Sequence, residues 1–452
     1  MHWSFDSVFY HIYPLGFCGA PKNNDFFSQP VSRLDKIYGW IGHMKSLGVN
    51  ALYLGPLFES TSHGYDTADY FHVDRRLGNN EQLKNLIAAL HQNGIRVILD
   101  GVFNHVGRSF WAFRDLRMNM QSSPYSSWFH GLDFSQRSPL GDPFSYEGWN
   151  GHYNLVKLNL KNHDTREHLF DAVRMWIDYF EIDGLRLDAA DCIDMKFLQD
   201  LALVTKHKKK DFWLMGEIIH GDYRRWVNSQ TLDSVTNYEC YKGLYSSLND
   251  KNYFEIAYSL NRQFGTGGMY RNMPLYAFAD NHDVNRIASI IKDPVHIYPL
   301  YCLLFTMPGV PSVYYGSEWA VKGEKHHGSD DPLRPSLNLA DFTNGFTPEL
   351  TKALSRLSQV RHSSKALRRG DYTQLHVSMQ QFAFMRRTEN ETAVVVLNSS
   401  DKPVSLDLNI PSFSDSPFID VLNNNEVFNM KSGKLLIETL YPGWARVLLS
   451  QR

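Results

Sequence analysis

The sequence has 452 residues, of which 43% are hydrophobic and 21% charged, as is ordinary for a soluble globular protein. This length can bury a large core and points to one barrel-sized domain with something smaller attached. The 46 basic and 48 acidic residues give a formal net charge of -2, which excludes a general electrostatic attraction to nucleic acid or anionic membranes.

The N-terminal segment MHWSFDSVFYHIYPLGF lacks the basic start, apolar stretch and small-residue cleavage site of a secretory signal. The longest apolar region, residues 297–315, is interrupted by prolines and tyrosines and falls short of a membrane span. We therefore expect a cytoplasmic protein. The four cysteines show no metal-type spacing, which fits a reduced compartment, although pairing stays open; they are Cys18, Cys192, Cys240 and Cys302.

Eight β-rich runs alternate with amphipathic helical runs along most of the chain. The predicted strands lie within residues 8–17, 49–58, 95–103, 182–190, 212–219, 233–239, 275–283 and 310–318. Helices are predicted between them, for example over 33–48 and 80–94, and each of these two ends in a glycine.

Eight strand–helix units predict an α/β protein with a (β/α)8 TIM barrel, whose chemistry gathers at the carboxyl ends of the strands. A doubly wound open sheet is the competing topology, but no glycine-rich phosphate loop follows the first predicted strand.

Two further domains are predicted around this barrel. The irregular stretch after the third strand is too long for an ordinary loop, so we expect an inserted subdomain over 105–156. Short β-rich runs with polar turns near the end predict a C-terminal antiparallel β-sandwich domain over 367–452. The barrel then comprises 1–104 and 157–366.

Three carboxylates follow three predicted strands. Asp188 comes after the fourth strand, Glu217 after the fifth and Asp283 after the seventh. In a barrel these positions converge on one mouth, and a carboxylate pair about 5 Å apart is what a retaining glycosidase needs. Any one of them alone could be a strand-end ion pair or helix cap, but three together favour catalysis.

Neighbouring residues predict how the carboxylates divide the work. Arg186 precedes Asp188 by two residues, so both point to the same side of the strand, and the arginine is expected to keep this nucleophile ionised. Glu217 has apolar neighbours and no cation adjacent in sequence, a setting expected to raise its pKa and suit a proton donor.

Other polar residues are expected at the same mouth, as sugar-hydroxyl ligands or structural supports. They are Tyr65, Asp66, Asp100, Asn104, His105 and His282. A catalytic metal is not expected, because the sequence has no HExxH, no His-x-His and no Cys/His spacing. A GxSxG serine nucleophile is absent as well.

Seven short stretches occur in order between residues 64 and 316: GYDTADY, DGVFNH, KLNL, GLRLDAA, GEII, FADNHD and GVPSVYYG. In this order they resemble the α-amylase superfamily of retaining glycoside hydrolases. The resemblance implies that Asp188 is the nucleophile, that Glu217 is the general acid/base and that Asp283 binds sugar hydroxyls and favours a distorted ring. It also implies that Arg186 orients the nucleophile.

The resemblance implies sugar contacts too. Tyr65 matches the ring that stacks beneath the glucose being cleaved, and His105 and His282 match hydroxyl ligands, whereas Asp100 and Asn104 are taken as structural. Arg334, with Asp330 or Asp331, is expected to contact a further glucose unit.

Within the superfamily, the stretches KLN, GEIIHGDY and FWAFRDL resemble the neopullulanase and cyclomaltodextrinase branch of intracellular maltodextrin hydrolases. The resemblance implies hydrolysis of α-1,4-glucosidic bonds in maltooligosaccharides without an organic cofactor. Asp191 and Cys192 replace the Lys-His of many secreted amylases, which disfavours a structural calcium of that type without excluding calcium.

Two alternatives and the oligomeric state stay open. A 4-α-glucanotransferase would use the same catalytic residues, with a sugar hydroxyl in place of water. A noncatalytic binding relative would be expected to lack at least one of the three carboxylates, and all three are present.

Overall fold

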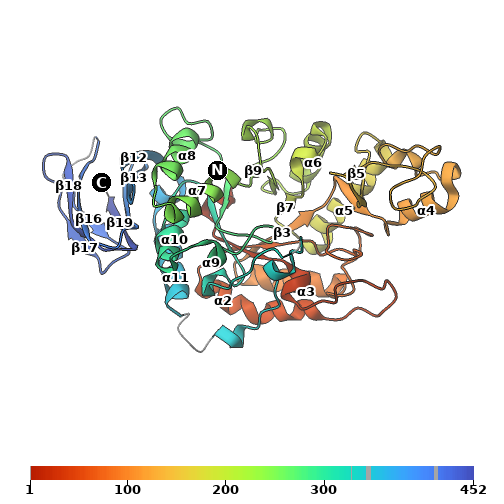
Figure 1. Ribbon diagram of the computed structural model, residues 1–452, viewed down its shortest axis with the longest axis horizontal. Coiled ribbons are helices and arrows are strands. Elements are labelled where there is room, and N and C mark those ends of the chain that lie inside the picture. Colours follow the sequence, from red (N-terminus) through yellow and green to blue (C-terminus); the bar gives the residue numbers. More distant parts are fainter. Residues whose placement is uncertain (1, 327, 343–347, 412–415, 452) are drawn as a thin grey trace.

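The computed structural model describes residues 2–326, 328–342, 348–411 and 416–451. Three parts follow one another across the molecule in Figure 1. The barrel lies in the middle, the insert with α4 and β5 at one end, and the C-terminal strands at the other. Among the described residues, no helix is both long and apolar enough to span a membrane.

Eight parallel strands form the barrel, and all eight predicted strands are confirmed. They are β1 (Phe9–Ile12), β2 (Ala51–Leu54), β3 (Arg96–Gly101), β7 (Gly184–Leu187), β8 (Trp213–Gly216), β9 (Ser234–Val235), β10 (Tyr276–Phe278) and β11 (Val310–Tyr314). They pair in the order β10-β11-β1-β2-β3-β7-β8-β9. A parallel bridge between Thr236 and Tyr276 joins the two ends of this order and closes the barrel.

The barrel interior is divided into an apolar and a polar layer. Phe9, Trp213 and Tyr276 stand at or near the amino ends of their strands, and the Phe9 ring lies 5.2 Å from that of Trp213 and 5.6 Å from that of Tyr276. Ile98 of β3 belongs to the same apolar cluster. Because side chains alternate along a strand, Asp100, two positions after Ile98, again faces inward. Asp100 pairs in register with Arg186, and both are buried. The apolar layer thus forms a floor beneath polar groups at the carboxyl ends.

Helices surround the strands. They are α1 (Pro14–Phe17), α2 (Ile41–Ser46), α3 (Asn80–Gln92), α5 (His163–Phe180), α6 (Met195–Lys208), α7 (Tyr238–Asn249), α8 (Phe254–Phe264), α9 (Ile287–Ile290), α10 (Ile297–Thr306), α11 (Pro348–Ser363) and α12 (Lys365–Arg369). The predicted helix over 33–48 is a 3₁₀ helix over Arg33–Trp40 followed by α2. Gly39 and Gly42 lie at this change, and glycine weakens regular α-helix.

The insert has its own small sheet. Strands β4 (His105–Gly107), β6 (His152–Lys157) and β5 (Gly148–Trp149) pair antiparallel in that order, and α4 (Trp111–Asn119) precedes β5. Because β4 follows β3 closely and starts at His105, the insert begins at the carboxyl-end mouth of the barrel.

The C-terminal part is a sandwich of two antiparallel sheets. The larger sheet contains β12 (Asp371–Val377), β13 (Gln381–Arg387), β14 (Glu391–Asn398), β19 (Trp444–Gln451), β16 (Phe418–Asp420) and β17 (Glu426–Phe428). The smaller sheet pairs β15 (Val404–Asn409) with β18 (Lys434–Leu440). An apolar cluster fills the space between them, and it includes Val394, Leu408, Ile437 and Leu448. All four cysteines of the chain are free.

The other face of the larger sheet packs on the barrel, and a buried arginine joins the two. Arg386 on β13 donates from Nη1 to the carbonyl of Thr306 at 2.9 Å and from Nη2 to the carbonyl of Gly370 at 2.9 Å. Thr306 ends α10, so the guanidinium satisfies a carbonyl at a helix end that lies inside the domain interface.

We expect Arg386→Met to lower the free energy of unfolding by about 1–3 kcal/mol, because the buried carbonyl of Thr306 then loses this donor. Urea denaturation followed by circular dichroism measures the change. Arg356→Met is the control, because Arg356 also donates across this interface, to the carbonyl of Val421, but is exposed. Equal losses in the two variants would contradict this assignment.

Candidate active site

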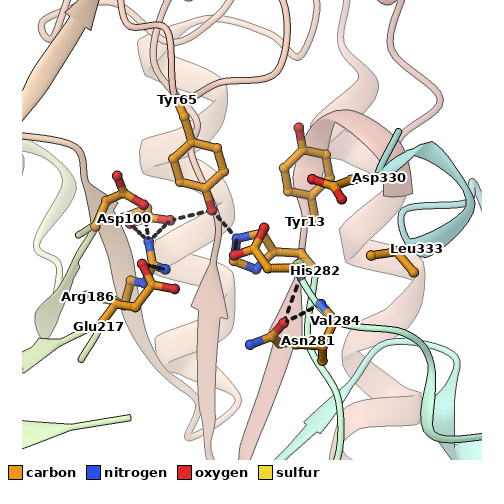
Figure 2. A network of polar contacts seen from close by, with 12 residues as sticks. Tyr13, Tyr65, Asp100, Arg186, Glu217, Asn281, His282, Val284, Asp330 and Leu333 are labelled. Carbon is orange, nitrogen blue, oxygen red and sulfur yellow. Dashed lines mark hydrogen bonds and ion pairs between the residues drawn. The ribbon is translucent and has the colours of Figure 1, made fainter. Parts of the chain in front are cut away.

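Arg186 is the centre of the polar layer. Its Nη1 donates to Asp100 Oδ1 at 2.9 Å and to Asp188 Oδ1 at 3.0 Å, and its Nη2 lies 2.8 Å from Glu217 Oε2. The residue is 2% exposed. Figure 2 shows the guanidinium between Asp100 and Glu217. One cation therefore gathers carboxylates from the ends of β3, β7 and β8.

A strained turn brings Glu217 to this centre. Ala189 has a φ of 44°, in the left-handed region that costs a non-glycine residue on the order of 1–2 kcal/mol. In this conformation its N–H donates to Glu217 Oε2 at 3.2 Å, and the next N–H, of Ala190, donates to the carbonyl of Glu217 at 3.1 Å. The turn after Asp188 thus holds the backbone and side chain of Glu217.

The shared guanidinium corrects two expectations. Glu217 does not stand in an apolar setting without a cation, because Arg186 of the neighbouring strand contacts it. Arg186 also does not give Asp188 a low pKa. Burial raises the pKa of Asp188 well above its ordinary value, the lowering by Arg186 is smaller, and Glu217 and Asp100 raise the pKa further. Asp188 therefore holds a proton more firmly than an isolated aspartate.

Asp283 stands across the site in a cationic setting. Its Oδ2 lies 2.9 Å from His282 Nε2, and its Oδ1 accepts from Arg334 Nη2 at 2.9 Å. Burial acts to raise the pKa of Asp283, but His282 and then Arg334 outweigh it and hold the pKa well below its usual range. Asp283 is therefore ionised at neutral pH.

Arg334 is fixed by several contacts. Its Nη2 also donates to Asp330 Oδ2 at 3.0 Å, its Nε donates to the carbonyl of His282 at 3.0 Å, and its guanidinium lies 4.5 Å from the ring centroid of Tyr13. The expected association of Arg334 with an aspartate thus involves Asp330. Asp331 instead pairs with Lys22.

Tyr65 lies between the two halves of the site. Its hydroxyl donates to Asp100 Oδ2 at 3.1 Å and contacts His282 Nε2, and its ring is stacked 5.5 Å from that of His282 (Figure 2). His105 also lies beside the Arg186 cluster, and its Nε2 is 3.9 Å from Asp188 Oδ2. Burial lowers the pKa of His105 to about 4, so its ring is neutral at neutral pH.

His105 presents an unused polar atom to the site. Nε2 is buried without a hydrogen-bond partner, whereas Nδ1 faces Asn104 Nδ2 at 3.2 Å. A buried polar atom without a partner is costly, and a ligand hydroxyl beside Asp188 would satisfy it.

Asp66 is placed differently from the other candidates. Its carboxylate accepts from the N–H of Ser62 at 3.1 Å and from the hydroxyl of Ser62 at 2.7 Å, and it is not among the residues that line the cavity. It supports the loop that carries Tyr65. Asp100 contacts Arg186 and the hydroxyl of Tyr53, so its role is structural as well.

These side chains line a cavity of about 1160 Å³. The insert contributes Trp149 and His152 to its wall, and the loop after β7 contributes Asp191 and Cys192. This volume lies above the range of roughly 300–1,000 Å³ for small-molecule pockets and suits an extended ligand. Within the described ranges, no group of three His, Cys, Asp or Glu side chains is placed to hold a metal ion.

The sequence reasoning missed two aromatic residues of the site. Tyr238 begins α7, and its hydroxyl lies 3.3 Å from Glu217 Oε1 and 3.1 Å from Asn281 Nδ2. Trp149 on β5 stacks 5.5 Å from His105. Tyr238 could have been noticed near the carboxyl end of the predicted sixth strand, over 233–239, whereas Trp149 carries no such signal.

Comparison with known proteins gives the following matches. The family model described as alpha amylase, catalytic domain, matches residues 12–343, and that described as maltogenic amylase, C-terminal domain, matches residues 372–440. The chain is 30% identical over 430 residues to a cyclomaltodextrinase of Geobacillus thermopakistaniensis, covering 90% of this chain and 71% of that protein.

Two further proteins resemble it. An intracellular maltogenic amylase of Bacillus subtilis is 30% identical over 351 residues, covering 73% of this chain and 57% of that protein. The solved structure of the cyclic α-maltosyl-(1→6)-maltose hydrolase from Arthrobacter globiformis in complex with maltose superposes with a TM-score of 0.82 at 27% identity, covering 100% of both chains.

The raised pKa of Asp188 predicts a stability that depends on pH. The folded state holds this proton more firmly than the unfolded state, so the carboxyl destabilises the fold as pH rises from about 4 towards the raised pKa. We expect Asp188→Asn to be more stable than the parent at pH 7 by about 1 kcal/mol, an advantage that disappears near pH 4.

Scanning calorimetry at several pH values measures this difference. Asp25→Asn is the control, because Asp25 is exposed and hydrogen bonds from Ser28 lower its pKa to about 2, so its replacement brings no gain at pH 7. A lower melting temperature of Asp188→Asn than of the parent at pH 7 would contradict the assignment.

Proposed function

Because the chain belongs to the α-amylase family of glycoside hydrolases, we propose that it hydrolyses α-1,4-glucosidic bonds of maltooligosaccharides with retention of configuration. One observation carries this proposal: the guanidinium of Arg186 contacts both Asp188 and Glu217. Carboxylates that share one guanidinium are close enough for the separation of about 5 Å that retaining glycosidases use.

In the first step, an Asp188 oxygen attacks the anomeric carbon of the glucose unit while Glu217 donates its proton to the glycosidic oxygen. The bond between that oxygen and the anomeric carbon breaks, and a β-glucosyl ester of Asp188 forms. This step needs Asp188 as the ionised carboxylate and a proton on Glu217.

In the second step, Glu217 takes a proton from a water molecule, whose oxygen attacks the anomeric carbon and releases Asp188. Two inversions restore the α configuration. These steps use water and side chains of this chain only, and we propose that no cofactor is required.

The remaining site residues are proposed to bind the glucose units. Asp283 accepts hydrogen bonds from hydroxyls of the glucose unit being cleaved, and its partner His282 donates to them. The Nε2 atom of His105, which has no partner in the protein, contacts another hydroxyl of the same unit. Tyr65 supplies an apolar face beneath the ring. Arg334 is proposed to contact the next unit.

The names of the relatives support an α-glucan substrate. They include a cyclomaltodextrinase, and one solved structure of a related hydrolase holds maltose. Another relative is named intracellular, and we propose a cytoplasmic location for this chain on that ground.

Asp188→Asn is expected to lower kcat on maltotriose by about 10⁴-fold or more, because no ester can form. Glu217→Gln should lower kcat by about 10²–10⁴-fold, since the leaving oxygen then departs without a proton. Chromatography of products measures both. Activity of Asp188→Asn equal to the parent would overturn the mechanism and favour a noncatalytic role.

Product analysis also tests the outcome of the reaction. Proton NMR should show the α-anomer of the new reducing end first, since the mechanism retains configuration. Incubation with maltotriose separates hydrolysis, which gives only shorter products, from transfer to another sugar, which gives longer ones. The first appearance of the β-anomer would contradict the double displacement.

A time course on maltoheptaose, β-cyclodextrin and pullulan, side by side, resolves the substrate further. We expect maltoheptaose to be cleaved, because a linear α-1,4 chain fits an open cavity of about 1160 Å³. Rapid opening of β-cyclodextrin would assign the chain to ring-opening enzymes such as its cyclomaltodextrinase relative.

A further inference from the structure

A second groove, of about 850 Å³, lies outside the cavity described above. One wall is the segment 219–223, which follows β8, and the other is formed by α7 and α8. Within the described residues this groove shares two lining residues, Ile219 and Tyr238, with the catalytic cavity. The two hollows therefore lie next to each other.

The junction lies on the Glu217 side of the catalytic cavity. Ile219 follows Glu217 by two residues and is 47% exposed, and the hydroxyl of Tyr238 lies 3.3 Å from Glu217 Oε1. In the proposed mechanism Glu217 protonates the leaving sugar. A chain that extends from the leaving sugar would therefore run past Ile219 into the groove.

The groove displays two aromatic side chains on one face of α8. Phe254 is 48% exposed and Tyr258 is 69% exposed. They are four residues apart in a helix, so they lie on the same side about 6 Å apart along its axis. Exposed aromatic side chains suit a ligand with apolar faces and polar edges.

Balanced charges line the rest of the groove. Lys242 lies 3.2 Å from Glu255, and Arg262 pairs with Glu239. Two acidic and two basic side chains that neutralise each other give no preference for an anion or a cation. They do offer donors and acceptors, which a neutral ligand rich in hydroxyls can use.

We propose that this groove binds the distal part of a linear α-1,4-glucan whose cleaved bond lies in the catalytic cavity. The inference rests on the proposed function and extends it to chain length. Glucose rings on the leaving-group side stack on Phe254 and Tyr258, and their hydroxyls contact the paired charges. Long chains are consequently held better than short ones, which end before they reach α8.

The test compares kcat/KM on a long linear maltodextrin with kcat/KM on maltotriose. We expect Tyr258→Ala to lower the ratio of the two values about five- to tenfold, and Phe254→Ala/Tyr258→Ala to lower it further, because stacking surface is lost only for long chains. Tyr441→Ala is the matched control, since Tyr441 is 60% exposed and lies in the C-terminal sandwich.

If Tyr258→Ala is active and its ratio of the two kcat/KM values equals that of the parent, the proposed role of the groove is wrong, while the proposed function stands. The same holds if Tyr441→Ala lowers the ratio as much as Tyr258→Ala does. If the parent hydrolyses neither substrate, the proposed function fails and the groove with it. Binding of the long maltodextrin to Asp188→Asn, with and without Tyr258→Ala, gives a readout without turnover. A weaker affinity only in the double variant supports the groove, and equal affinities overturn it.

Discussion

The contact on which the site depends is that of one buried guanidinium with three carboxylates. A buried carboxylate without a partner is costly, and three of them at the ends of adjacent strands would repel one another. Arg186 lies on the middle strand of the three and reaches Asp100, Asp188 and Glu217 at once. Without this cation, the ends of β3, β7 and β8 could not all carry acidic groups at the same depth.

The barrel makes this arrangement possible by separating its layers. Packed aromatic rings such as Phe9 and Trp213 fill the amino end and exclude water from below. Stability comes from that floor, so the layer above can hold charges and strain. Ala189 is an example, because its left-handed backbone conformation is unfavourable by itself. In this conformation its N–H donates a hydrogen bond to Glu217 Oε2, which helps to offset the strain.

Most of the barrel could be predicted from the sequence, because β-rich runs alternate with amphipathic helical runs and these local patterns indicate where each strand lies. What could not be predicted depends on register between strands. The sequence shows that Arg186 neighbours Asp188, but not that β3 and β8 bring Asp100 and Glu217 to the same guanidinium. Asp66 is a different case, because local hydrogen bonds from Ser62 hold its carboxylate and it is not among the residues that line the cavity.

The catalytic cavity and the groove beside α8 differ in charge, which fits catalysis in the first and substrate binding in the second. Five carboxylates contact two guanidinium groups, those of Arg186 and Arg334, at the catalytic cavity, so acidic groups outnumber these two cations. An acidic site stabilises the positive charge that develops on a sugar ring as its bond breaks. A neutral glucan gains little from that field before the reaction. Its affinity must therefore come from apolar faces and hydroxyl contacts, and the neutral groove beside α8 offers both.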